Sequence, residues 1–241
     1  MKSVSLTHKG LVRETNQDSI VNLKDSRGDY FIGIADGMGG HKAGDVASAA
    51  AVKELSSYFR KCDKSLCVES REELTRKIKD INGKIYKMSL ENEDYEGMGT
   101  TLTLCVTDGV KAVFYQVGDS RGYIIGSQGI RQITKDQSLV QFMVDTRQIT
   151  PQQALEHPSR HVILSALGTD EEYDMDIYEE QLNPGDTILL CSDGLTDFVP
   201  DEDIERIVRS AGSVKRAAAA LVNEANSNGG ADNISVILFE A

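Results

Sequence analysis

The 241-residue chain has no tryptophan, few aromatic residues (6%), four prolines and four cysteines. It also has no apolar run near 18 residues and no signal peptide, so we expect neither a transmembrane helix nor export by that route. The cysteines are scattered, which predicts reduced thiols in a cytoplasmic protein and not a disulfide framework. Cys62 and Cys67 are near each other, but no second pair completes a zinc site; the others are Cys105 and Cys191.

Basic residues are also in short supply. The chain has 26 Lys and Arg against 38 Asp and Glu, a formal net charge of −12. Nucleic acids and anionic membranes attract basic patches, so this balance argues against both as partners and against a metal-dependent nuclease. Hydrophobic residues (40%) and charged residues (27%) are in ordinary proportion for a soluble globular protein. We see no repeat or linker and therefore expect a single domain over residues 1–241.

Hydrophobic periodicity predicts both helices and strands. Amphipathic spacing indicates helices at 43–60, from Ser70 to about Met88, at 201–209 and at 213–226. Apolar or alternating runs predict about ten strands: one within 1–10, then 19–23, 31–35, 101–106, 112–117, 123–125, 130–133, 174–180, 186–192 and 233–239. The strands from 101 to 133 are interpreted as an antiparallel meander, and 136–168 as an irregular insertion over the sheet edge. The class is α+β.

Five aspartates stand at or near expected strand ends. The central strand 31–35 leads into Asp36, which is followed by the glycine-rich turn 37–41. A lone Asp-Gly is usually only a turn, but here the arrangement recurs along the chain, so we expect the carboxylates to converge at one rim of a sheet. Clustered carboxylates repel one another unless a cation is bound, and all-oxygen donors favour Mg²⁺ or Mn²⁺ over zinc. The other four are Asp18, Asp119, Asp193 and Asp232.

Six segments carry a family resemblance. In order and spacing, RETNQDS, FIGIADGMGGH, GTTLTL, VGDSRGYI, LLCSDGLTD and GGADNISVI resemble the type 2C protein serine/threonine phosphatases (the PPM family), and the bacterial branch most of all. The resemblance runs from about Thr7 to the last strand. It implies a four-layer α-β-β-α sandwich of two antiparallel sheets flanked by helices, and it implies that 136–168 is a mobile flap beside the active site.

The resemblance implies metal-dependent hydrolysis of phosphoserine and phosphothreonine in proteins. Water would be activated by two Mn²⁺ or Mg²⁺ ions, the kind of site that lowers the pKa of water and clamps phosphoryl oxygens. In the family pattern Asp36 bridges both ions and the carbonyl of Gly37 binds one of them. Asp193 and Asp232 bind the other ion.

Three further positions take roles from the same resemblance. Asp18 would act mostly through metal-bound water. Asp119 resembles the ligand that joins Asp193 at a weaker third ion near the flap. Arg13 resembles the residue that holds the substrate phosphate, and a guanidinium fork suits phosphate oxygens.

Some positions depart from the family pattern. Met38 stands where the animal branch has a histidine that is proposed as the general acid. His41 lies three residues on, and either a proton-donating or a structural role is open for it. Gln17 stands where some relatives carry glutamate.

Two hypotheses of function follow. The first is a cytoplasmic signalling phosphatase, expected to be a monomer, that acts on phosphorylated proteins and opposes a bacterial serine/threonine kinase. No cysteine stands in a phosphate-binding loop, so the metal-dependent class is preferred over the tyrosine phosphatases. The alternative is a catalytically silent docking or sensing module of the same fold. Such relatives usually lose metal-binding aspartates, whereas this chain keeps all five. The physiological substrate stays open.

Overall fold

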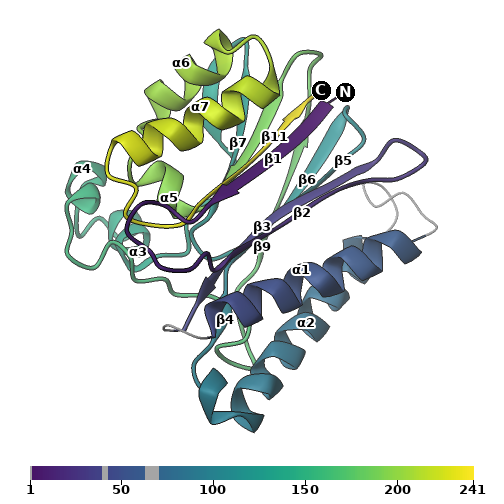
Figure 1. The fold of residues 1–241 in the computed structure, drawn as a ribbon, viewed down its shortest axis with the longest axis vertical. Coiled ribbons are helices and arrows are strands. Elements are labelled where there is room, and N and C mark those ends of the chain that lie inside the picture. The colour runs from purple at the N-terminus through teal and green to yellow at the C-terminus, as the bar shows by residue number, and fades with distance from the viewer. Residues whose placement is uncertain (1, 40–42, 63–70) are drawn as a thin grey trace.

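The protein is a four-layer sandwich (Figure 1). The structure, a computed structural model, describes residues 2–39, 43–62 and 71–241. Two antiparallel sheets pack face to face. Helices α1 (Gly44–Lys61) and α2 (Arg71–Glu91) cover the outside of one sheet, and α6 (Asp201–Ser210) and α7 (Val214–Ser227) cover the outside of the other. The predicted α-β-β-α architecture is confirmed.

Each sheet mixes strands from both ends of the chain. The first, here called sheet A, has the order β1 (Lys2–His8), β11 (Ile234–Glu240), β10 (Thr187–Cys191), β7 (Arg121–Gly126) and β8 (Gly129–Gln132). Sheet B has the order β2 (Asp18–Lys24), β3 (Tyr30–Met38), β5 (Leu102–Thr107), β6 (Lys111–Val117) and β9 (Asp176–Gln181), with β4 (Gly99–Thr100) paired to β3.

Three apolar cores hold the layers together, and strand periodicity divides residues between them. On β3, Phe31 and Ala35 pack in the core under α1 and α2, while Ile32 and Ile34 point into the core between the sheets. Successive side chains on a strand point to opposite faces, so a strand in the middle of four layers must be apolar on both. The third core lies between sheet A and helices α6 and α7. The continuous apolar run of β3 is the sequence signature of this position.

Two predictions about strands are wrong. The expected meander over 101–133 is interrupted, because β5 and β6 pair within sheet B whereas β7 pairs with β10 in sheet A. The connection between β6 and β7, which contains Asp119, therefore crosses from sheet B to sheet A. The central strand also does not end at Asp36, since Gly37 and Met38 continue it by pairing with β4. Local alternation identifies strands but does not specify their partners.

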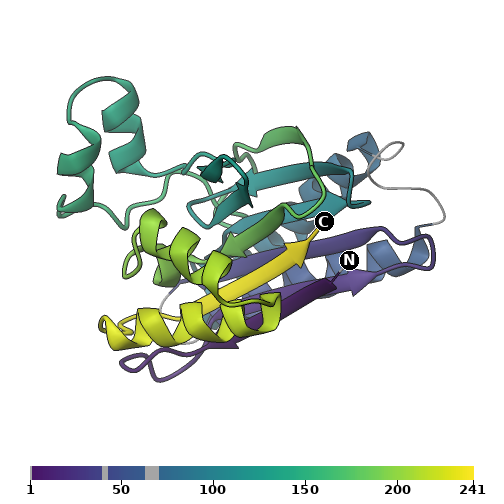
Figure 2. The ribbon, with the colours of Figure 1, turned by 90° about the horizontal axis from the view of Figure 1, so that it is seen from above.

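The remaining helices are short. Helices α3 (Leu139–Asp145) and α4 (Pro151–Leu155) lie within the predicted insertion and project from the end of the sandwich (Figure 2). The 3₁₀ helix η1 (Glu93–Tyr95) and helix α5 (Asp193–Thr196) have no predicted counterpart. Ser70, Cys67 and His41 lie outside the described residues. No helix in the described ranges has the length and apolarity needed to cross a membrane.

Candidate active site

A cleft of about 930 Å³ opens at one end of the sandwich. Its walls come from the loop before β2, the end of β3, the β6–β7 connection, helix α5, the segment after α4 and the residues before β11. Six of the seven predicted site residues line it: Arg13, Asp36, Gly37, Asp119, Asp193 and Asp232. The seventh, Asp18, lies beside Asp36 on the neighbouring strand.

The register of β2 and β3 places two carboxylates directly opposite each other. Asp18 pairs with Asp36 at the end of the antiparallel ladder. Like charges in this position destabilise a sheet, so a pair of this kind calls for a compensating cation or proton. The main chain at Asp36 is fixed by Thr101, which lies between β4 and β5: the Asp36 N–H donates to Thr101 Oγ1 (3.0 Å), and its carbonyl accepts from the Thr101 N–H (2.8 Å).

Gly37 is buried against the first residue of α1. A Cβ atom at Gly37 would lie 2.0 Å from the Gly44 carbonyl oxygen, so no other residue fits there without moving the helix. Helix α1 therefore packs directly against the main chain that follows Asp36.

Asp193 and Asp232 approach from sheet A. Asp193 is the first residue of α5, two residues after the end of β10, and Asp232 comes two residues before β11. The two turns touch, because a Cβ at Gly194 would lie 2.0 Å from the Asn233 carbonyl oxygen. Arg13 Nη2 lies 2.7 Å from Asp232 Oδ2, with half of the Arg13 side chain exposed (53%).

Two carboxylate oxygens in this cluster are buried without a hydrogen-bond partner in the described part of the chain, Asp18 Oδ1 and Asp193 Oδ1. The other oxygen of Asp18 accepts from Ser235 Oγ (2.6 Å) and Ser192 Oγ (2.9 Å). Buried polar atoms are almost always satisfied, so an unpartnered carboxylate oxygen facing other carboxylates indicates a ligand position. Oxygen donors of this charge and number suit a hard divalent cation.

The electrostatics agree with this interpretation. Burial raises the pKa of Asp18 to about 6, although the hydrogen bonds from Ser235 and Ser192 oppose the shift. Burial, and then the charges of Asp18 and Asp193, raise the pKa of Asp36 well above its ordinary value. The pKa of Asp193 is likewise raised by burial, with Asp119 as its strongest charged neighbour. Such a cluster binds either protons or cations at neutral pH.

Asp119 lies on the connection between the sheets. Burial, followed by the nearby charge of Asp136, raises its pKa to about 7. The next residue, Ser120, is fully buried, and its hydroxyl lies 3.0 Å from that of Thr101. Thr101 thus joins the main chain of Asp36 to the turn that carries Asp119. Sequence reasoning missed this contact, since Thr101 appears only as the first residue of the predicted strand 101–106.

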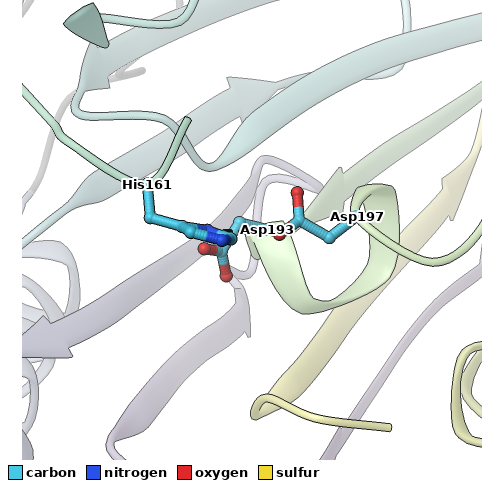
Figure 3. A group of neighbouring side chains, drawn as sticks. All are labelled: His161, Asp193 and Asp197. Atoms are coloured by element: carbon cyan, nitrogen blue, oxygen red, sulfur yellow. Dashed lines mark ion pairs between the residues drawn. The ribbon is translucent and has the colours of Figure 1, made fainter. Parts of the chain in front are cut away.

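A second group of donors joins Asp193 to a histidine from the segment after α4 (Figure 3). Ligand atoms of His161, Asp193 and Asp197 lie within 4.8 Å of one another. His161 comes from the segment after α4 and lies 3.4 Å (Nδ1 to Oδ2) from Asp197 at the end of α5. Neither His161 nor Asp197 was predicted as a site residue. The signal for Asp197 was its place four residues after Asp193, one helical turn away.

The departures from the family pattern also face the cleft. Met38 and Gln17 are both lining residues, and the Gln17 carbonyl accepts from the Gly37 N–H (3.2 Å). A thioether carries no proton to donate, so Met38 cannot act as a general acid.

Comparison with known proteins gives a consistent result. A family model described as Protein phosphatase 2C matches residues 8–229. The serine/threonine phosphatase stp of Listeria monocytogenes is 38% identical over 235 residues, which cover 97% of this chain and 93% of the relative.

Solved structures resemble the whole chain. The serine/threonine phosphatase Stp1 from Staphylococcus aureus has a TM-score of 0.94 and 38% identity, covering all of this chain and 94% of the other. The catalytic domain of the serine/threonine protein phosphatase PstP, solved in complex with two manganese ions, has a TM-score of 0.86 and 34% identity, covering 98% and 96%.

Proposed function

The chain belongs to the protein phosphatase 2C family, and from that premise we propose that it hydrolyses phosphoserine and phosphothreonine in proteins with divalent cations. The observation that carries this proposal is that carboxylates from both sheets lie together at one cleft, with the exposed guanidinium of Arg13 beside them. Asp18 and Asp36 come from sheet B, Asp193 and Asp232 from the sheet A side, and Arg13 stands at the opening.

The donor set fits two cations. Asp36 would hold both ions and the Gly37 carbonyl one of them, Asp193 and Asp232 would hold the other, and Asp18 stands beside Asp36 on the neighbouring strand. The unpartnered oxygens of Asp18 and Asp193 and the raised pKa of Asp36 support this assignment. When bound, two such ions acidify a water molecule and withdraw charge from phosphoryl oxygens, which is the largest demand of phosphate ester hydrolysis.

The protein groups have separate tasks. The guanidinium of Arg13 is placed to donate to phosphate oxygens at the opening, since its exposed side chain already reaches a carboxylate on the cleft floor. The main chain next to Asp36 and Asp193 is held by Thr101 and by the close packing of Gly37 and Gly194, so little reorganisation is needed during the reaction. Because Met38 has no proton to give, we propose that the leaving group is protonated from water.

The finer features are part of the same proposal. Mn²⁺ or Mg²⁺ would serve, and manganese is the ion bound in the PstP relative. A weaker third ion would bind between Asp119 and Asp193, where His161 and Asp197 add neighbouring donors.

We further propose one domain over 1–241 with 136–168 as a flap, and a monomer that opposes a serine/threonine kinase in the cytoplasm. The buried thiol of Cys191 supports a reducing compartment.

The decisive experiment measures hydrolysis of p-nitrophenyl phosphate and of a phosphothreonine peptide by the purified chain. Excess Mn²⁺ is compared with EDTA, and Asp193→Ala is the control variant. We expect turnover that depends on Mn²⁺ and is lost in Asp193→Ala while the circular dichroism spectrum is unchanged. Mn²⁺ binding without turnover of either substrate would favour a silent docking module instead.

A further inference from the structure

We propose that Asn233 is the positioning residue that sets the place of Arg13, by holding both ends of the Arg13 loop with one side chain. The Arg13 loop is defined here as residues 9–17. This inference rests on the proposed role of Arg13 as the phosphate-binding group. It assigns to Asn233 a function that neither its position in a motif nor its lack of charge reveals.

Three hydrogen bonds connect the Asn233 amide to the Arg13 loop. Its Nδ2 donates to the carbonyls of Lys9 and Thr15, both at 2.9 Å, and its Oδ1 accepts from the Gln17 N–H at 2.8 Å. A side-chain amide has two donor hydrogens and an acceptor oxygen with two lone pairs, so both donors and one lone pair are used on the loop. These contacts lie on both sides of Arg13 and close the loop around a single group.

The loop has little other anchorage near its centre. Residues 11–15 are exposed, including the apolar side chains of Leu11 (65%) and Val12 (67%). At its start, the Leu11 N–H donates to the Gly230 carbonyl (2.7 Å), and Gly10 takes a positive φ of 78°. A Cβ at Gly10 would lie 2.1 Å from the Asp232 carbonyl oxygen, so the loop lies directly on the chain that leads to Asn233.

Asn233 is itself fixed in place. It is nearly buried (5% exposed), and its carbonyl is enclosed by Gly194. The Ser192 hydroxyl, which donates to Asp18, also lies 3.4 Å from this carbonyl. Asn233 therefore links the turn of Asp193 to the loop of Arg13. A guanidinium on a long, half-exposed side chain reaches a defined point only if its own main chain is held, and small displacements of such groups lower substrate affinity.

The chain provides a matched control in Asn82 on α2. Asn82 is also nearly buried (1%), and its Nδ2 donates to the carbonyls of Asp170 (2.9 Å) and Glu171 (3.1 Å). Its Oδ1 accepts from the Gly168 N–H at 2.7 Å. An equivalent set of three hydrogen bonds thus holds residues 168–171. Truncation of Asn82 therefore has a similar structural cost but does not affect the Arg13 loop.

The test is a double-mutant cycle on the Mn²⁺-loaded enzyme. Steady-state KM and kcat for a phosphothreonine peptide are measured for Arg13→Ala, Asn233→Ala, the double variant and Asn82→Ala. Calorimetric Mn²⁺ titrations and thermal unfolding accompany each. We expect KM to rise about tenfold in Arg13→Ala and nearly as much in Asn233→Ala, with kcat changed less than about threefold, and no further rise in the double variant. Asn82→Ala should unfold at a lower temperature but keep its KM.

Each alternative result has a distinct meaning. An unchanged KM in Asn233→Ala, or a rise that multiplies with that of Arg13→Ala, would overturn the inference while leaving the role of Arg13 intact. An unchanged KM in Arg13→Ala would remove the phosphate-binding role and the inference together. A loss of Mn²⁺ affinity in Asn233→Ala would show that it acts through Asp232 instead. If Asn233→Ala does not fold, the smaller polar change Asn233→Ser takes its place in the same cycle.

Discussion

At the scale of single residues, the cleft contains buried carboxylate oxygens, on Asp18 and Asp193, that no group in the described part of the chain satisfies. Asp18 and Asp36 face each other across two strands, and each has a raised pKa for which burial is the main cause. Other buried carboxylates have a charged partner. Arg121, for example, holds Asp136 through both of its carboxylate oxygens at 2.7–2.9 Å. A buried charge without a partner destabilises the folded state. The contrast therefore indicates that the clustered carboxylates bind a ligand and do not stabilise the fold.

The hydroxyl of Thr101 is a first test of this arrangement. Thr101→Val keeps the shape of the side chain but removes the acceptor for the Asp36 N–H and the partner of Ser120. An unsatisfied buried N–H costs about 1–3 kcal/mol, and relaxation to satisfy it would move Asp36. We expect kcat to fall about tenfold and Mn²⁺ affinity to weaken by a similar factor, measured by steady-state kinetics and calorimetry.

Thr107→Val is the matched control for this substitution. Thr107 is buried at the end of β5, and its hydroxyl accepts from the Gly109 N–H (3.0 Å) at the turn that follows, outside the residues that line the cleft. It should lose stability but keep kcat and Mn²⁺ affinity. Equal kinetic losses in the two variants would mean that Thr101 only stabilises the sheet.

Asp119 gives a second prediction at this scale. Its carboxylate sits on the connection between the sheets, with a pKa raised to about 7, and it is the charged neighbour that most raises the pKa of Asp193. Asp119→Ala should lower turnover without displacing the two core ions, because Asp36, Asp193 and Asp232 remain. Calorimetry should still show two bound Mn²⁺ ions. Loss of both in this variant would contradict the assignment of Asp119 to a third ion.

At the scale of elements, one carboxylate of α1 forms ion pairs with two lysines of α2. Glu54 of α1 accepts from Lys77 Nζ (2.6 Å) and Lys84 Nζ (2.5 Å) of α2, and these bonds lower its pKa to about 2. Glu54→Gln should destabilise the protein at pH 7. Because Lys84 is half-exposed (54%), solvent screening limits the expected loss to about 1 kcal/mol, measured by urea unfolding.

The pH dependence of this effect has a definite sign. Glu54 has a lower pKa in the folded state than the ordinary 4.5, so its contribution is present above pH 4.5 and is lost as the pH falls towards 2. The difference between the native protein and Glu54→Gln should shrink over that window. Glu91→Gln, at an exposed pair with Lys87 on the same α2 helix (3.6 Å), should show no such difference.

Elements and their partners differ in how far the sequence predicts them. The helices and most strands follow from periodicity, as in the apolar stripe of α2 and the continuous apolar run of β3. Strand pairing does not follow from periodicity, since nothing in the sequence of residues 118–120 indicates that the chain passes from sheet B to sheet A there. The residues that support the site were missed for the same reason. Thr101 and Asn233 are uncharged, and their importance comes from contacts with segments 65 and 216 residues away.

At the scale of the whole molecule, the carboxylates lie where the two sheets meet. Sheet B supplies Asp18 and Asp36, and Asp193 and Asp232 flank strands of sheet A. The sheets already share an apolar core, so the protein does not depend on the site for its fold. Cations bound between them would nevertheless act as a cross-link, and any ligand that binds only the folded state stabilises it.

This gives a prediction for thermal unfolding. Mn²⁺ at a hundred times its dissociation constant should add about 3 kcal/mol, which corresponds to roughly 6–10 °C in Tm for a chain of this size. The measurement is differential scanning fluorimetry of the chelator-treated protein, with Mn²⁺ added at pH 5 and at pH 7.5.

The size of that shift should depend on pH. Asp18 and Asp119 have folded-state pKa values of about 6 and about 7 against an ordinary 3.8, so without cations their contribution is present below pH 3.8 and is lost as the pH rises through 6 and 7. Mn²⁺ competes with these protons and should therefore raise Tm more at pH 7.5 than at pH 5. Asp36→Asn removes the carboxylate opposite Asp18, so this variant should be more stable than the native protein without cations at pH 7.5, and it should respond little to Mn²⁺. Equal responses to Mn²⁺ in the two proteins would place the cations somewhere other than between the sheets.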